Sequence, residues 1–170
     1  SLPLGSAPEN QKRIFEFSEP SRGDIIIFRS NAFQGHQFIK RIAAVSGDKI
    51  KIINNLGIVT TPNIQTNGIV QTQYEDTRET IACEITNPQI TDHEQCNIKK
   101  EKFPYEENFH RIVLPPTNNN HTANENEITI PKGYVFVLGD NRGNSEDSRT
   151  AETGLVPISR IVAKYGKTIF

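Results

Sequence analysis

The feature that most constrains the fold of this chain is a series of short apolar runs, each ended by turn residues. Five of these runs are rich in β-branched or aromatic side chains: Ile25–Phe28, 37–45, Lys49–Ile53, Gly133–Leu138 and Ser159–Tyr165. Such runs between Gly, Pro, Asp and Ser are typical of strands, and a further short strand is expected at Arg13–Phe17. No segment shows sustained helical periodicity. The pattern predicts a mostly β protein with an antiparallel, barrel-like core.

A polar segment interrupts this core. Asn, Thr, Gln and Glu dominate from about residue 54 through residue 128, with one strand expected at His110–Leu114. Apolar character returns at Ile128–Ile130. We therefore predict that residues 1–53 and 129–170 form the core, and that residues 54–128 form an inserted polar β subdomain.

The two cysteines, Cys83 and Cys96, lie in this polar segment with twelve residues between them. By themselves they are compatible with two free thiols or with one disulfide formed in an oxidising compartment. A zinc site that uses them with His93 is not expected, because zinc sites usually contain a close cysteine pair. The four histidines show no triad or metal spacing and are expected to be surface or loop residues: His36, His93, His110 and His121.

Composition and charge exclude several classes of function. The chain is 35% hydrophobic and 23% charged, which indicates a globular protein rather than a disordered one. Its net charge of −1 gives no basis for binding nucleic acid. No apolar run approaches the ~20 residues that span a bilayer, and no signal-peptide pattern is present. Because the chain contains no methionine, we expect upstream sequence, an anchor included, to be absent from it.

The run from Gly139 to Arg149 directly follows the strand Gly133–Leu138, and nine of its eleven residues are polar or charged. Polar side chains at this density must form hydrogen bonds with each other or with the backbone. A plain surface turn and the scaffold of a site are both compatible with this. An EF-hand calcium loop is not, because Arg142 stands where a carboxylate or amide is required. Asp147 lies two residues before Arg149, so the two side chains can pair on one face.

A lysine inside an apolar strand is the second unusual feature. Strand alternation places Phe38, Lys40, Ile42 and Ala44 on one face, and Arg41 on the other. In one interpretation the lysine reaches water from a strand edge. In the other it is desolvated, and its pKa is lowered by the roughly 3 units that a general base near pH 7 requires. A neutral amine of this kind can accept the proton of a serine hydroxyl.

Three blocks of this sequence together resemble bacterial type I signal peptidase, in the clan of serine–lysine peptidases. The blocks are Arg22–Phe28, then Phe38–Arg41 followed by Gly47-Asp48, and then Gly139–Arg149. The last one matches the family's Gly-Asp-Asn-Arg-x-x-Ser-x-Asp-Ser-Arg at every defined position. One departure is that Ala44–Asp48 stands where the family usually has Gly-Leu-Pro-Gly-Asp, which implies a looser turn.

The resemblance implies a role for individual residues. These are Lys40 as the general base, Ser145 as the residue that orients its amine, Asp147 and Arg149 as a supporting ion pair, Arg41 as the basic partner beside the lysine, and Gly139 and Asp140 as the turn behind the site. The polar segment resembles the variable second domain of Gram-negative members, which often holds a cysteine pair. It therefore implies that Cys83 and Cys96 are bridged in the periplasm.

The nucleophile is where this chain departs most from the family. The family's serine normally lies in a Ser-Met-x-Pro-Thr box, and no such motif occurs here. The segment before Asp24 resembles the loop that follows this box in alphaproteobacterial signal peptidases, which implies that the serine lies upstream. Alternatively, Ser1–Gly5 resembles the Ser-x-Pro-x-Gly box of conjugative-transfer peptidases, with Ser1 as the nucleophile.

The activity that the resemblance implies is that of a membrane-bound serine endopeptidase that removes signal peptides from exported preproteins. An N-terminal anchor, absent here, would hold it at the inner membrane with its catalytic domain facing the periplasm, and it needs no metal, cofactor or nucleic acid. Without its serine this chain is expected not to cleave. The alternative from another class is a non-catalytic peptide-binding β-domain. A self-cleaving repressor is disfavoured, because no DNA-binding helical segment is evident.

Overall fold

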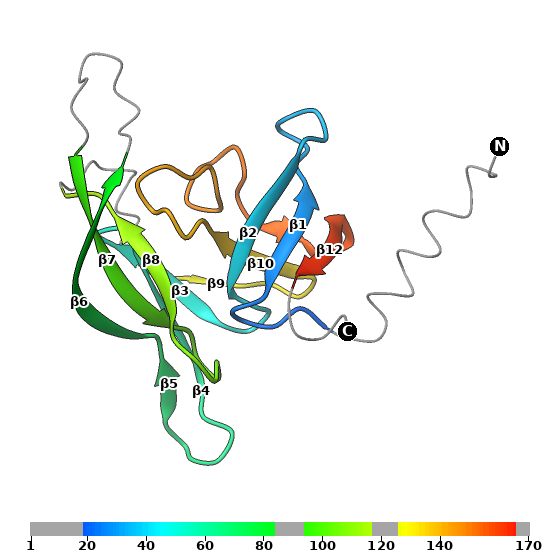
Figure 1. Cartoon of the computed structure of the whole chain (residues 1–170). Coiled ribbons are helices and arrows are strands. Elements are labelled where there is room, and N and C mark those ends of the chain that lie inside the picture. Colours follow the sequence, from blue (N-terminus) through cyan, green and yellow to red (C-terminus); the bar gives the residue numbers. More distant parts are fainter. Residues whose placement is uncertain (1–18, 84–93, 117–125, 166–170) are drawn as a thin grey trace.

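The computed structural model describes residues 19–83, 94–116 and 126–165 (Figure 1). Within these ranges the chain forms strands β1 to β12 and one short 3-10 helix, and no α-helix. The strands make three antiparallel sheets, which confirms the prediction of a mostly β protein. The strand expected at Arg13–Phe17 lies outside the described residues.

The first sheet has five strands in the order β11-β10-β2-β1-β12. Their bounds are β1 (Ile25–Arg29), β2 (Gln37–Ala44), β10 (Tyr134–Leu138), β11 (Val156–Pro157) and β12 (Ile161–Tyr165). Alternate side chains of β1 point inward, so that Ile26 and Phe28 are buried while their neighbours are not. They pack against Ile42, Val135 and Val137 in one apolar cluster. This sheet places β2 between β1 and β10.

The second sheet has four strands in the order β5-β4-β3-β9. Their bounds are β3 (Lys49–Ile53), β4 (Leu56–Pro62), β5 (Ile69–Gln71) and β9 (Ile128–Thr129). Asn54 and Asn55 join β3 to β4 with φ of 49° and 65°. A two-residue hairpin turn of type I′ has positive φ at both central positions, and asparagine adopts positive φ more readily than most other residues that have a side chain.

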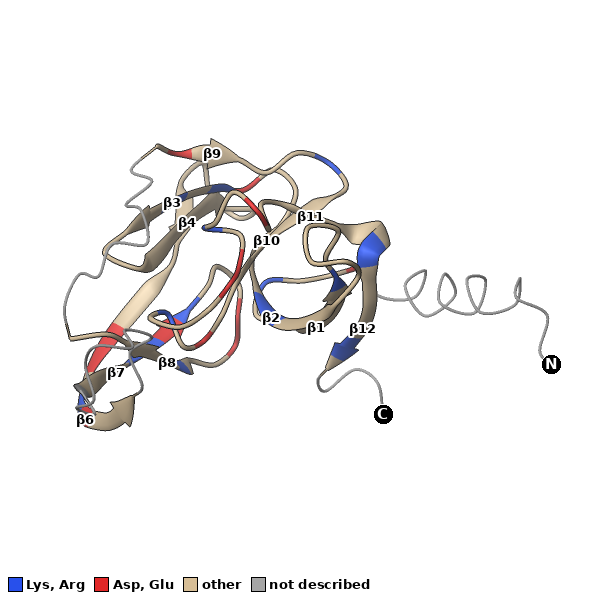
Figure 2. Ribbon diagram, turned by 90° about the horizontal axis from the view of Figure 1, so that it is seen from above, with Lys and Arg blue, Asp and Glu red and all other residues tan. Residues whose placement is uncertain are grey.

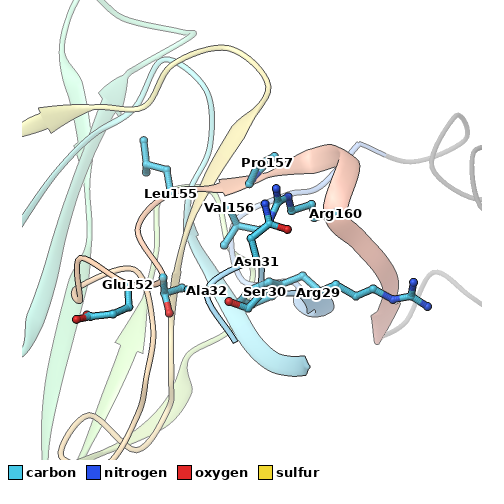
Figure 3. Close-up of a pocket in the computed structure, with 11 residues that line it drawn as sticks. Arg29, Ser30, Asn31, Ala32, Glu152, Leu155, Val156, Pro157 and Arg160 are labelled. Carbon is cyan, nitrogen blue, oxygen red and sulfur yellow. The ribbon is translucent and has the colours of Figure 1, made fainter. Parts of the chain in front are cut away.

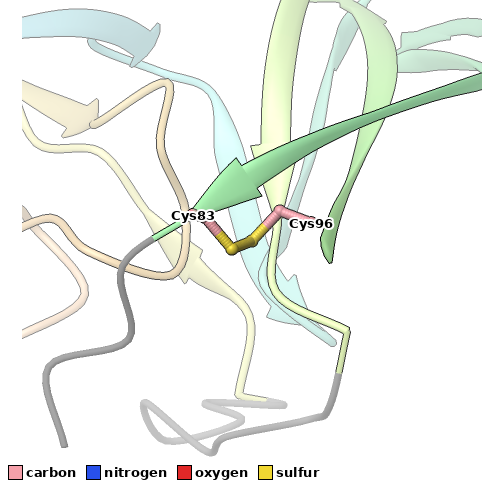
Figure 4. The surroundings of a disulfide bond; sticks show 2 residues. All are labelled: Cys83 and Cys96. Carbon is pink, nitrogen blue, oxygen red and sulfur yellow. A yellow bond between two sulfur atoms is a disulfide. The ribbon is translucent and has the colours of Figure 1, made fainter. Parts of the chain in front are cut away.

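The third sheet has the order β6-β7-β8 and lies at one side of the molecule, away from β1, β2 and β12 (Figure 1). Its strands are β6 (Gln73–Cys83), β7 (Glu94–Lys102) and β8 (His110–Leu114). A disulfide joins Cys83 at the end of β6 to Cys96 on β7, with Cα atoms 5.8 Å apart (Figure 4). The predicted cysteine pair is therefore bridged.

Two local expectations were wrong. The inward alternation of β2 stops at Ile42, because the pairing with β10 shifts by one residue between Ile42 and Ala44. A bulge of this kind turns the next residues, so Ala43 and Ala44 both pack into a second apolar cluster that Ile42 does not join. The last strand begins at Ile161 rather than Ser159, because Ile158–Arg160 forms a 3-10 turn.

The turn before β3 is held in place by the hydrogen bonds of one buried carboxylate, that of Asp48. Asp48 is 1% exposed and accepts hydrogen bonds from the backbone N–H of Val45 at 2.9 Å and from two guanidinium nitrogens of Arg22 at 2.7 and 2.6 Å. The turn thereby holds the ends of β2 and β3 to the segment that leads into β1.

Candidate active site

Lys40 lies in the middle of β2, opposite Ile26 of β1. Its amine lies 5.8 Å from the centre of the Phe38 ring, and its Nζ donates a hydrogen bond to Ser145 Oγ at 2.8 Å. The two residues are 105 positions apart in the chain. The structure thus brings the lysine of the apolar strand to the serine of the polar run.

The surroundings of Lys40 favour its neutral form. Burial lowers the pKa of the amine; the Asp147 carboxylate opposes this and the Arg149 guanidinium adds to it, and the net pKa is lowered from its usual value. A lower pKa raises the fraction of amine that has a free lone pair near neutral pH. Such an amine can act as a general base.

The Asp147–Arg149 pair lies behind Ser145 and is buried, with side chains 0% and 1% exposed. The guanidinium meets both carboxylate oxygens at 2.8 Å, and Gly139 N–H donates to Asp147 Oδ2 at 2.9 Å. Burial by itself raises the pKa of Asp147, but the hydrogen bond and charge of Arg149 outweigh it and the net pKa is lowered. These contacts favour the ionised form of the Asp147 carboxylate, and the pair holds the chain in place two residues after Ser145.

Gly139 leaves the space in which Ser145 sits. A Cβ atom built on Gly139 would lie 1.9 Å from Ser145 Oγ, far inside van der Waals contact. Only glycine lets the serine hydroxyl approach the strand end this closely.

Arg41 points to the other side of β2 and meets Asp140 through two hydrogen bonds of 2.9 and 2.8 Å. It also donates to the carbonyl oxygen of Gly23 at 2.9 Å. The residue next to the lysine therefore ties β2 both to the polar run and to the turn before β1.

Sequence reasoning missed a second buried ion pair. Arg142 and Glu101 of β7 are both 0% exposed, and the guanidinium donates to both carboxylate oxygens, at 2.9 Å to Oε2. His110 was expected to be a surface or loop residue, and this was wrong: its side chain is 11% exposed and its Nε2 lies 2.9 Å from Glu101 Oε1. No spacing marks either partner, because Glu101 stands among other Lys and Glu residues of a polar strand.

A small hollow of about 150 Å³ lies beside the lysine and is lined by Ile25, Ile39, Lys40, Arg41 and Asp140. A larger pocket of about 180 Å³ lies between the loop after β1 and the segment around β11 (Figure 3). Neither Lys40 nor Ser145 lines that pocket. Ile25, Ile39 and Arg41 share one face of the β1–β2 pair, so the hollow lies on the Arg41 side of β2, and Ser145 does not line it.

Some of the residues singled out in the sequence are not described by the structure. Ser1, like His93 and His121, lies outside the described residues. In the part of the chain that is described, no group of three His, Cys, Asp or Glu side chains has the geometry to hold a metal ion. Among the same residues, no helix is long and apolar enough to cross a membrane.

Acidic and basic positions are interspersed along the ribbon (Figure 2).

Comparisons with known proteins identify relatives of this chain. The chain is 31% identical over 157 residues to signal peptidase I of Rickettsia conorii and 29% identical over 156 residues to that of Rickettsia canadensis. Each match covers 89% of this chain and 52% of the relative, so the chain spans about half the length of these relatives. A crystal structure of a signal peptidase I from Enterococcus faecalis aligns with 85% of this chain and 94% of its own, at 22% identity and a TM-score of 0.40.

The family itself is identified by a profile that spans nearly the whole sequence. The profile of signal peptidase, peptidase S26, matches residues 6–170. The match contains the Lys40 strand and the polar run that meets it. The chain therefore belongs to the signal peptidase family, peptidase S26.

Proposed function

We propose that this chain is part of a signal peptidase I, a membrane-bound serine endopeptidase that removes signal peptides from exported preproteins, with Lys40 as the general base. One observation carries the proposal: the half-buried Lys40 amine lies 2.8 Å from Ser145 Oγ, with the buried Asp147–Arg149 pair behind that serine. The arrangement favours the neutral form of the amine and holds it at a fixed position, and activation of a serine hydroxyl requires both.

In the proposed reaction, the Oγ atom of the nucleophilic serine attacks the scissile carbonyl carbon, and neutral Lys40 takes the proton of that serine hydroxyl. The tetrahedral intermediate collapses when the Lys40 ammonium returns that proton to the leaving amine, and an acyl-enzyme remains. Lys40 then takes a proton from water, whose oxygen attacks the ester carbonyl, and the proton passes to the departing serine oxygen. Ser145 keeps the amine pointed at the reacting groups throughout and is not itself acylated.

We place the nucleophile on a segment upstream of this sequence. The supporting facts are that the chain has no Ser-Met-x-Pro-Thr box and spans about half the length of its relatives. The membrane anchor and the periplasmic orientation belong to the same proposal. In the alternative, Ser1 is the nucleophile.

The division of the chain is also proposed. Residues 1–53 supply Lys40, and residues 129–170 supply the polar run that meets it, so these two parts form the catalytic core. Residues 54–128 form the insertion. Within it, β4 pairs with β3 and β5 pairs with β4. Strands β6, β7 and β8 form a separate sheet, which an isolated bridge from Val113 to Asn141 links to the polar run.

Cleavage of a purified preprotein by the full-length protein tests the proposal. The wild type is expected to release the signal peptide, and the Lys40→Ala variant to release none while keeping its β-sheet circular dichroism. Lys40→Arg should also fail, because a guanidinium stays charged at working pH. Near-normal cleavage by Lys40→Ala would refute the serine–lysine assignment. Turnover by the present chain that disappears in Ser1→Ala would instead make Ser1 the nucleophile.

A further inference from the structure

The buried Arg142 guanidinium connects the polar run to the three-stranded sheet. Its counter-ion is Glu101, which comes from β7 and lies 41 positions away in the chain. Glu101 is itself held on two further sides, by the Tyr74 hydroxyl at 2.6 Å and by His110 Nε2 at 2.9 Å. A fully buried guanidinium requires such a partner, because an uncompensated charge in the interior is strongly unfavourable.

The other hydrogen bonds of Arg142 reach the residues that position Ser145. Its Nε donates to the carbonyl oxygen of Gly139 at 2.9 Å, and its own carbonyl oxygen accepts from Arg149 Nη1 at 2.9 Å. Gly139 is the residue whose N–H holds Asp147 and whose missing side chain makes room for Ser145. A shift of the Arg142 side chain therefore acts directly on Gly139, and a shift of the Arg142 backbone acts on Arg149.

The backbone of the polar run is attached to the same sheet. Val113 of β8 donates its N–H to Asp140 O at 2.8 Å and accepts the Arg142 N–H at 2.9 Å. The β3–β4 hairpin adds a second attachment, because Asn55 O accepts from Arg142 Nη1 at 3.2 Å and Asn55 Oδ1 accepts from Arg149 Nη1 at 3.3 Å. The run is thus fixed at its backbone by β8 and at its buried side chain by β7.

We propose that Glu101 is a positioning residue for the reaction: its ion pair with Arg142 holds the polar run so that Ser145 Oγ stays in contact with the Lys40 amine. The proposal assigns the inserted three-stranded sheet a part in catalysis, without any contact between that sheet and substrate. It rests on the proposed function of Lys40 for its catalytic consequence, but the geometric part can be tested on this chain alone.

The first test measures the pKa of the Lys40 amine in the folded chain. Trace acetylation with acetic anhydride across a pH series, read by mass spectrometry of the peptide that contains Lys40, gives that pKa, with the half-exposed Lys49 as an internal reference. In the Glu101→Gln variant the carboxylate charge is lost but the size of the side chain is kept. The groups that face Lys40 are Asp147, Arg149, Glu146 and Asp140, and those that face Glu101 are Arg142, His110 and Tyr74.

We expect Glu101→Gln to raise the Lys40 pKa, because release of the polar run exposes the amine to water. An upward shift of roughly one unit would lower the neutral fraction about tenfold at a pH below both values. The matched control is Glu79→Gln on β6, which removes an equally sized carboxylate from an ion pair with Arg111 that is about half exposed. The control should leave the Lys40 pKa unchanged. A Glu101→Gln protein that is folded, even if less stable, and has an unaltered Lys40 pKa would overturn the proposal.

Glu101→Asp keeps the experiment decisive if Glu101→Gln does not fold. The aspartate preserves the buried negative charge but is one methylene shorter, so Arg142 must move to meet it. The Lys40 pKa should again rise relative to wild type, and an unchanged value in this variant also overturns the proposal.

The second test is cleavage of a preprotein by the full-length protein. We expect Glu101→Gln to lower kcat about tenfold or more with KM changed less than about twofold, since misplacement of a reacting group by roughly 1 Å can cost on the order of 100-fold. If Lys40→Ala abolishes cleavage and Glu101→Gln leaves kcat intact, the positioning role fails and the proposed function stands. If Glu101→Gln raises the Lys40 pKa but Lys40→Ala still cleaves, the proposed function fails and the structural link stands.

Discussion

The polar run 139–149 and the strand β6 have similar compositions and opposite surroundings. Both are dominated by charged and hydroxyl side chains. In the run, Arg142 and Asp147 are fully buried and each is paired with an opposite charge. On β6, the only buried residue is Cys83, and the charged side chains face solvent. The same residue types therefore build a site scaffold in one place and a solvated surface in the other.

This difference predicts at which positions the loss of a charge lowers stability. Exposed ion pairs such as Glu79–Arg111 typically contribute about 0–1 kcal/mol, whereas breaking a buried pair by removing one partner costs about 3–5 kcal/mol. Substitutions in the run should therefore affect activity or stability strongly, and matched substitutions in the three-stranded sheet should not, unless they touch Glu101 or its partners.

The largest contrast is between two lysines. Lys40→Ala in the full-length protein should lower the rate of preprotein cleavage by on the order of 10⁴-fold or more, because no other base is in place. Lys100→Ala, on the exposed side of β7, should cleave at the wild-type rate. Single-turnover assays with one preprotein provide the measurement. Comparable cleavage rates for Lys40→Ala and Lys100→Ala would contradict the role of Lys40 as the general base.

Two aspartates give the next largest effect. Asp147→Ala leaves the buried Arg149 without its partner and should lower the free energy of unfolding by about 3–5 kcal/mol. Asp76→Ala removes a carboxylate that is 88% exposed. This substitution should change the free energy of unfolding by no more than about 0.5 kcal/mol. Urea unfolding of this chain, followed by circular dichroism, measures both. A change below about 1 kcal/mol for Asp147→Ala would show that the buried pair has little effect on stability.

Gly139 and Gly143, two glycines within the run, allow the same substitution to be compared at a crowded position and at a less crowded one. Gly139→Ala places a methyl group 1.9 Å from Ser145 Oγ, so the serine must move and overpacking should cost about 1–3 kcal/mol. Gly143→Ala meets only the Pro115 side chain at 3.2 Å or more and should cost less. Thermal unfolding reports stability, and the Lys40 pKa reports the position of the serine. An unchanged Lys40 pKa in Gly139→Ala would contradict the assigned position of Ser145.

Ser145→Ala should have a smaller effect, because it removes one orienting hydrogen bond worth about 1 kcal/mol. Preprotein cleavage by the full-length protein should then slow roughly fivefold rather than stop. Ser46→Ala, at the exposed turn before β3, is the matched control and should be neutral. Complete loss of activity in a folded Ser145→Ala variant would mean that this serine does more than orient the lysine.

The smallest effect concerns His110 on β8, whose side chain is 11% exposed. Burial lowers the pKa of His110, but the hydrogen bond to Glu101 and the nearby Glu106 carboxylate outweigh this and the net pKa is raised. A raised folded pKa means that the stabilisation is complete below the unfolded value of about 6.5 and is lost as pH rises through the folded value. Stability of this chain should therefore decline over that window. The decline should disappear in His110→Gln and persist in His36→Gln, as urea titrations at several pH values would show.

Much of the fold could be predicted from local patterns. The bounds of Lys49–Ile53 and His110–Leu114 agree with the expected strands, because alternating β-branched and turn residues act over a few neighbours. The bulge after Ile42 could not be predicted, since it depends on how β10 pairs with β2. Which parts of 54–128 join the sheet of β3 was likewise not apparent from composition.

For the site, the sequence by itself determined the local contacts. Asp147 and Arg149 are two residues apart and pair directly, and the Gly139 gap opens toward a serine six positions later. The tertiary structure alone decided that Glu101 neutralises Arg142 and that the His110 ring contacts Glu101. The physical reason is that a buried charge needs only an opposite charge within reach, and contacts across 41 positions leave no periodic trace in the sequence.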